Sequence, residues 1–108
     1  MSELFEKGAI LNVVEMIEYS AGGVTSKQVL KNDAGNITLF SFDKGQGLSE
    51  HTAPFDAVVE ILDGEAEITI DGKPLLLTTG QIVIMPANIP HALFAKQQFK
   101  MLLTMIKG

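Results

Sequence analysis

Apolar and polar residues alternate along much of this chain, and turn-forming residues separate the alternating segments. From Glu65 to Asp71 the polar residues occupy odd positions and the apolar residues occupy even positions. A period of two is typical of a strand with one buried face. Ile37 to Asp43 likewise places Phe40 and Phe42 on one face. We therefore expect β-strands at both places.

Turn residues divide the chain into segments of about 5 to 10 residues, a length typical of strands. Many short strands joined by such turns predict an all-β sandwich or barrel. We expect Asp63 and Gly64 to close a hairpin. The turn signals lie at residues 22–23, 32–35, 45–47, 63–64, 71–74, 79–80 and 86–90.

Two segments depart from simple alternation. Asn12 to Tyr19 begins with an N-cap residue type and spaces Val13, Met16 and Ile17 as on a helix, so it predicts one or two helical turns. Residues 99–106 are apolar on both faces, which is typical of a strand covered twice, with a short helix as the alternative. Because an apolar second face favours self-association, we also expect a homodimer.

Composition sets the class of protein. With 108 residues, 46% of them hydrophobic and 19% charged, residues 1–108 are expected to fold as one domain. No apolar run reaches the roughly 18 residues of a membrane span, and residues 1–8 lack the pattern of a secretory signal. We therefore expect a cytoplasmic protein that does not associate with membranes.

Charge and cysteine content narrow the chemistry further. The net charge is −5 and all eight basic residues are lysine, which argues against nucleic acid as a ligand. There is no cysteine, so disulfides, thiolate metal sites and cysteine nucleophiles are excluded.

The only two histidines lie in similar turn-and-strand contexts. The first context reads Gly45-x5-His51-x-Ala53-x3-Ala57-x6-Gly64, and the second reads Gly80-x5-Pro86-x-Asn88-x2-His91-x3-Ala95. This pair resembles the two motifs of the cupin superfamily, G-x5-H-x-H-x3-E-x6-G and G-x5-P-x-G-x2-H-x3-N. The resemblance implies a small single-domain cupin of the cupin 2 type, whose fold is a double-stranded β-helix (jelly-roll) barrel.

The departures from these motifs bear on function. The resemblance assigns metal ligands to positions 51, 53, 57 and 91, and here Ala53 and Ala57 stand at two of them. His51 and His91 are the remaining candidate metal ligands. Two imidazoles alone hold a divalent metal weakly, since three protein ligands are the usual minimum. Asp56, Gln28 and Gln46 are candidates for a substitute ligand.

If the chain from His51 to Ile61 is one alternating strand, its odd positions share the inner face of the barrel. This face predicts a mostly apolar pocket with the two histidines at its polar end, a form typical of small-molecule sites. The alternative is that these side chains simply fill the barrel. The expected ligand-binding residues on this face are His51, Ala53, Phe55 and Ala57, together with His91 and Leu93. The strand order that the cupin resemblance implies adds Phe40, Phe42, Met85 and Met101 as neighbours.

Two functions follow from this pocket. The first is a binding protein that holds a small molecule, with the histidines providing hydrogen bonds or weak metal contact. The second is a cupin enzyme of the oxygenase, isomerase or decarboxylase type, which uses His51 and His91 with a third, non-standard ligand to Fe, Mn, Ni or Zn. The sequence does not decide between these functions, and it assigns no catalytic residue and no certain cofactor.

Overall fold

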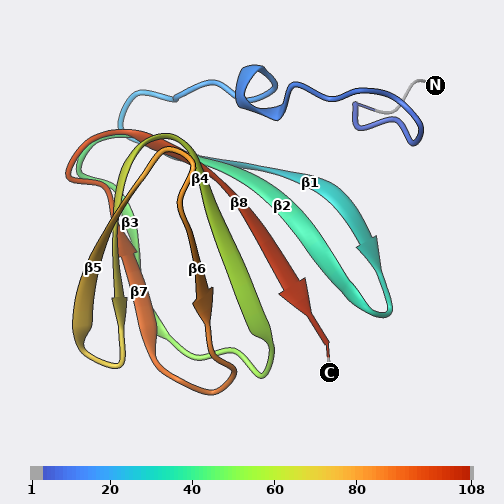
Figure 1. Cartoon of the computed structure of the whole chain (residues 1–108). Coiled ribbons are helices and arrows are strands. Elements are labelled where there is room, and N and C mark those ends of the chain that lie inside the picture. The colour runs from blue at the N-terminus through green and yellow to red at the C-terminus, as the bar shows by residue number, and fades with distance from the viewer. Residues whose placement is uncertain (1–3, 108) are drawn as a thin grey trace.

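The computed structural model describes residues 4–107 and is built almost entirely of strands (Figure 1). The all-β prediction is confirmed. The strands are β1 (Val24–Asn32), β2 (Gly35–Phe42), β3 (Gly47–His51), β4 (Asp56–Ile70), β5 (Lys73–Thr78), β6 (Ile82–Met85), β7 (His91–Phe94) and β8 (Phe99–Ile106). The segment 99–106 is thus a strand and not a helix. Among the described residues, no helix is long and apolar enough to span a membrane.

The strands form two antiparallel sheets that share β4. The first sheet has the order β1-β2-β8-β4-β6, and the second has the order β3-β7-β4-β5. The first half of β4 pairs with β6 and β8, whereas its second half pairs with β5 and β7. Figure 1 shows the curled shape that results.

The bend in β4 lies at Gly64, where the sequence predicted a hairpin turn. That prediction is wrong, because β4 runs through Asp63 and Gly64 without a break and instead carries a register shift between Ile61 and Asp63. Gly64 has a φ of +79°, and a Cβ at this position would lie 2.0 Å from the carbonyl oxygen of Gln98. Such a bulge bends a strand and adds one residue to its alternation. The bend therefore carries β4 from one sheet to the other.

The alternation in β4 changes phase across this bulge. Ala57, Val59 and Ile61 are buried before it, and Ala66 and Ile68 are buried after it. The odd positions thus face the core in the first sheet and the even positions face it in the second. The period-two prediction for residues 65–71 is confirmed.

The segment before β1 crosses the outer face of the first sheet. The helical prediction for residues 12–19 is confirmed only as a single 3₁₀ turn, Val13–Glu15, which the Asn12 side chain does not cap. Ile17 is fully buried in this segment. One side chain from each of four neighbouring strands binds the segment. These bonds join Lys27 to the Met16 carbonyl (2.8 Å), Ser41 to the Glu18 carbonyl (2.8 Å), Lys100 to the Val14 carbonyl (2.7 Å) and Tyr19 to the Asp63 carboxylate (2.5 Å).

The prediction of one alternating strand from His51 to Ile61 is wrong. β3 ends at His51 in the second sheet, and β4 begins at Asp56 in the first sheet. Residues 52–55 cross between the sheets as an irregular connection. Pro54 lies in this connection and lacks the N–H that a strand ladder requires.

Candidate functional site

The two histidines are register partners on neighbouring strands. His51 ends β3 and pairs with His91, which begins β7. Their ring centroids lie 4.3 Å apart, and the ring planes meet at 67°. His91 is buried, with 6% of its surface exposed, whereas His51 is exposed. The pair therefore presents one open and one enclosed imidazole at the same place.

Each imidazole is oriented by the backbone two residues before it. The Nδ1–H of His51 donates to the carbonyl of Ser49 (2.8 Å), and the Nδ1–H of His91 donates to the carbonyl of Ile89 (3.2 Å). Because a carbonyl only accepts, these bonds place the proton of the neutral ring on Nδ1. The Nε2 lone pair of each ring is then left for a hydroxyl, an amine or a metal ion.

Three connections meet at this end of the barrel, which we call the histidine end. They are residues 52–55, the β4–β5 hairpin turn at 71–72, and residues 86–90 (Figure 1). The Asn88 N–H donates to the Ala53 carbonyl (2.7 Å), and the Asp71 N–H donates to the Pro90 carbonyl (2.8 Å). These backbone bonds tie all three connections together.

Asn88 stands where the cupin motif has glycine, and the structure gives a physical reason for this substitution. Its φ is +64°, in the left-handed region. Glycine adopts this region freely, and asparagine is among the few other residues that tolerate it. The substitution therefore preserves the backbone of the second motif.

The predicted ligand-binding residues divide into three groups. Ala57 and Met85 are register partners at the histidine end, and Leu93 is the next inward residue after His91. Ala53 and Phe55 lie half-buried in the 52–55 connection. A third group, far along the sheet toward the Gly64 bend, consists of Phe40, Phe42 and Met101.

The third group belongs to the buried core, as do Ala57, Met85 and Leu93 of the first group. The rings of Phe42 and Phe99 stack with their centroids 4.5 Å apart. Phe42 is the register partner of Phe99, and Phe99 in turn pairs with Gly64. Phe40 is the register partner of Met101, and Met101 in turn pairs with Ile61. The structure therefore brings His51 and His91 together, and it places Phe40, Phe42 and Met101 farther along β2 and β8, toward the Gly64 bend.

The candidate substitute ligands lie elsewhere or are engaged. The Asp56 carboxylate accepts the Ala87 N–H (2.9 Å). Gln46 lies beyond the opposite end of β3, with its backbone bonded to Ala95 (2.8 Å), and Gln28 lies on β1 at the edge of the first sheet. Within residues 4–107, no group of three or more histidine, aspartate and glutamate side chains is placed to hold a metal ion.

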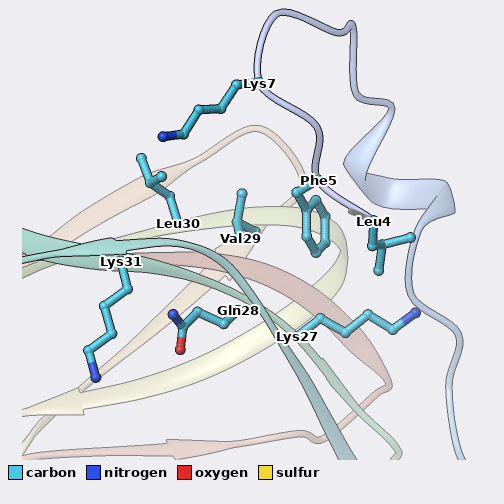
Figure 2. Close-up of a pocket in the computed structure, with 8 residues that line it drawn as sticks. All are labelled: Leu4, Phe5, Lys7, Lys27, Gln28, Val29, Leu30 and Lys31. Atoms are coloured by element: carbon cyan, nitrogen blue, oxygen red, sulfur yellow. The ribbon is translucent and has the colours of Figure 1, made fainter. Parts of the chain in front are cut away.

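One cavity lies apart from the histidines, neither of which lines it. It has a volume of about 620 Å³ and lies between β1 and residues 4–7. Three lysines line it, but they point in different directions: Lys7 lies on the same side of β1 as Leu30, Lys31 extends from the other side, and Lys27 extends toward the 3₁₀ turn (Figure 2). A single bound anion would therefore not meet all three ammonium groups.

A second cavity, of about 430 Å³, lies beside the histidine end. Two of its lining residues, Ile70 and Ile89, adjoin His91 and were not among the predicted site residues. Ile70 pairs with His91, and the Ile89 carbonyl accepts the bond from the His91 ring. The period-two pattern placed Ile70 on the inner face, which was a usable signal. The position of Ile89 depends on a loop conformation that no periodicity reports.

Comparisons with known proteins agree with this architecture. The family model described as a cupin domain matches residues 38–107. A conserved protein of unknown function from Streptococcus pyogenes is 39% identical in its crystal structure, with a TM-score of 0.92, over 100% of this chain and 96% of that chain. A cupin superfamily protein from Desulfitobacterium hafniense is 31% identical, with a TM-score of 0.90, over 98% of this chain and 97% of that chain.

A third similar structure is that of a longer protein. The cupin 2 conserved barrel domain protein from Leptotrichia buccalis is 42% identical, with a TM-score of 0.87, over 90% of this chain and 47% of that chain. This chain thus spans about half of that protein. A comparison with curated proteins gives no match.

Proposed function

The chain belongs to the cupin family, and on that premise we propose that it binds a small molecule at the histidine end of its barrel. The observation that carries the proposal is the facing pair of imidazoles, His51 and His91, each with Nδ1 held by a backbone carbonyl. Two adjacent Nε2 acceptors suit a ligand that donates from a hydroxyl group. Ala57, Met85 and Leu93 provide the apolar floor, with Ala53 and Phe55 at the mouth.

The residues present do not fit a resident metal ion. Ala53 and Ala57 offer no donor atom, and the histidines supply two ligands where three are the usual minimum. We therefore propose binding rather than metal-dependent catalysis. Elemental analysis of untagged protein is expected to find substoichiometric metal. Near-stoichiometric Fe, Mn, Ni or Zn would instead support the oxygenase, isomerase or decarboxylase alternative.

The proposed ligand class is tested with matched pairs of small compounds. Phenol is compared with anisole, and lactate with 2-methoxypropionate, because in each ether a methyl group replaces the hydroxyl proton and removes the donor. Methionine methyl NMR reports where binding occurs. Met85 and Met105 flank Ala57 in the register, whereas Met16 lies on the segment that crosses the outer face and serves as an internal control.

We expect a hydroxyl compound to shift the Met85 and Met105 methyl signals and both histidine ring signals, with no change at Met16. The matched ether should bind at least about tenfold more weakly, because it leaves Nε2 without a donor. His51→Gln should abolish the response. Equal responses to alcohol and ether, or no response to any compound, would contradict the proposal.

We also propose that the chain forms a homodimer through the outer face of the first sheet. A mostly apolar row crosses four strands there: Leu30, Ile37, Thr104 and Val58 are neighbours in the strand register. Leu30 and Ile106 on this face are 41% and 54% exposed. Exposed apolar rows of this kind favour packing against a second copy.

A further inference from the structure

A side cavity lies where the free edges of the two sheets face each other. β5 pairs only with the second half of β4, and β6 pairs only with the first half, so no ladder of backbone hydrogen bonds joins β5 to β6 in the described chain. The two strands are connected by the turn at 79–81 and separate toward the histidine end (Figure 1). The cavity between them has a volume of about 430 Å³ and is lined by Ile70, Asp71, Lys73, Leu75, Val83, Ile84, Pro86 and Ile89.

Backbone bonds hold the walls of this cavity in place. The Asp71 N–H donates to the Pro90 carbonyl (2.8 Å), which ties the β4–β5 hairpin to the connection that follows β6. Ile70 pairs with His91 on one side and with Lys73 on the other. Neither histidine lines the cavity, so it is a separate compartment beside the proposed site.

The walls are aliphatic and partly exposed to water. Ile70 and Val83 pack against the core and form the floor. Leu75 and Ile84 stand on the facing strands with 41% and 59% of their surfaces exposed. A ligand that covered them would gain hydrophobic stabilisation. No aromatic residue lines the cavity, so branched aliphatic groups fit it better than flat rings, which gain from aromatic stacking.

Two opposite charges stand at the rim. Asp71 and Lys73 flank Gly72, and neither side chain makes an ion pair or a hydrogen bond with any residue in the described range 4–107. A carboxylate ligand alone would be attracted by Lys73 but repelled by Asp71, and an amine alone would meet the reverse. A zwitterion satisfies both charges. We propose that this cavity binds an aliphatic α-amino acid, with its side chain between β5 and β6 and its charged groups at Asp71 and Lys73.

The probe is L-leucine, and three compounds serve as matched controls. 4-Methylpentanoate lacks the ammonium group, 3-methylbutylamine lacks the carboxylate, and glycine lacks the aliphatic side chain. Isoleucine methyl NMR locates binding, because Ile70, Ile84 and Ile89 line the cavity while Ile17 is buried in the segment that crosses the outer face. We expect L-leucine to shift the three cavity signals saturably and to leave Ile17 unchanged. Each control compound should bind at least about tenfold more weakly, the loss expected for one charged hydrogen bond or a buried side chain.

Variants separate this proposal from the proposed hydroxyl site. Lys73→Gln and Asp71→Asn should each weaken leucine binding about tenfold. Asparagine suits the φ of +50° at position 71, so Asp71→Asn preserves the turn. Lys44→Gln, in an exposed turn at the opposite end, and His51→Gln should leave leucine binding unchanged. No saturable shift with L-leucine, equal binding of all four compounds, or loss of binding in Lys44→Gln would overturn the proposal. Loss in His51→Gln would place leucine at the histidine pair and overturn the separate cavity site.

Discussion

Tyr19 and Asp63 are 44 residues apart in the sequence, and the Tyr19 hydroxyl donates a 2.5 Å hydrogen bond to the Asp63 carboxylate. Asp63 lies in the bulge where β4 bends, so this bond ties the segment before β1 to the corner between the two sheets. Lys100 lies 5.1 Å from the centre of the Tyr19 ring and adds a cation–π contact. Burial, together with the bond to Asp63, raises the pKa of Tyr19 above its usual value.

Tyr19→Phe should lower the free energy of unfolding by about 1 to 2 kcal/mol, because it removes a hydrogen bond to a charged group. The raised pKa also predicts a pH dependence. The neutral phenol is favoured in the folded state, so this stabilisation is complete below the pKa of an unfolded tyrosine, about 10, and is lost as the pH rises above it. Urea unfolding of both proteins from about pH 8 to pH 11 measures the difference. A difference that stays constant above pH 10 would show that the Tyr19 pKa is not raised.

Gly64→Ala should be far more destabilising than Gly45→Ala, although both glycines have positive φ. A Cβ at Gly64 would lie 2.0 Å from a backbone oxygen, whereas nothing lies within 4 Å of a Cβ at Gly45. We expect a loss of about 1 to 2 kcal/mol at Gly45, from the left-handed backbone alone, and about 3 to 5 kcal/mol at Gly64. Thermal unfolding of the two variants checks this contrast. Equal losses would mean that the bulge relaxes freely.

Zn²⁺ or Ni²⁺ should affect both histidines together. The ring centroids lie 4.3 Å apart, and neither Nε2 atom makes a hydrogen bond within residues 4–107, so we expect one weakly bound ion to reach both rings. Ring-nitrogen NMR is expected to show both Nε2 signals moving with the same midpoint, and His51→Gln should weaken the effect at His91. Separate midpoints for the two rings would indicate that they bind metal independently.

Ala57→Glu should strongly destabilise the apo protein, because Ala57 is 3% exposed between Met85 and Met105. A carboxylate there is buried without a partner, and we expect a loss of about 3 kcal/mol or more. Adding Ala53→His supplies a third imidazole toward the cupin ligand set. Mn²⁺ or Ni²⁺ should then raise the melting temperature of the double variant, since a ligand that binds only the folded state stabilises it. If the metal has no effect, positions 53 and 57 do not converge on the histidines.

The proposed dimer is tested at Ile106, which is exposed on the outer face of the first sheet. Ile106→Lys should produce a monomer, because a buried lysine at an apolar interface has no partner. Leu76→Lys is the matched control, since Leu76 is 57% exposed on β5 in the second sheet. Sedimentation velocity should give about twice the 11.7 kDa chain mass for the wild type and Leu76→Lys. A monomeric wild type would contradict the dimer.

The sequence predicted those features that depend on local patterns. Alternation identified β2 and the second half of β4 as strands, and the motif resemblance picked out His51 and His91, which lie side by side. One prediction failed because a glycine with positive φ is compatible with two different structures. Asp63-Gly64 reads as a turn, yet its left-handed glycine serves equally well in a bulge, and only the packing against Gln98 selects the bulge.

The break after His51 was harder to foresee. The alternation of apolar and polar residues continues across Pro54 in the sequence, but residues 52–55 cross between the two sheets. The choice depends on pairing partners far away in the sequence: β3 pairs with β7, and the first half of β4 pairs with β8. Local periodicity carries no information about such partners, so it could not show that the chain changes sheets between His51 and Asp56.

The sharing of β4 between the sheets has a consequence for synthesis on the ribosome. Every strand that pairs with β4 follows it in the chain: β5, β6, β7 and β8. β8 also separates β4 from β2, so a central position of the first sheet is filled by the strand translated last of the eight. Until β8 leaves the exit tunnel, β2 and the first half of β4 lack their shared neighbour, and their apolar faces remain open to other chains. The first sheet is therefore completed only when this final strand inserts between β2 and β4.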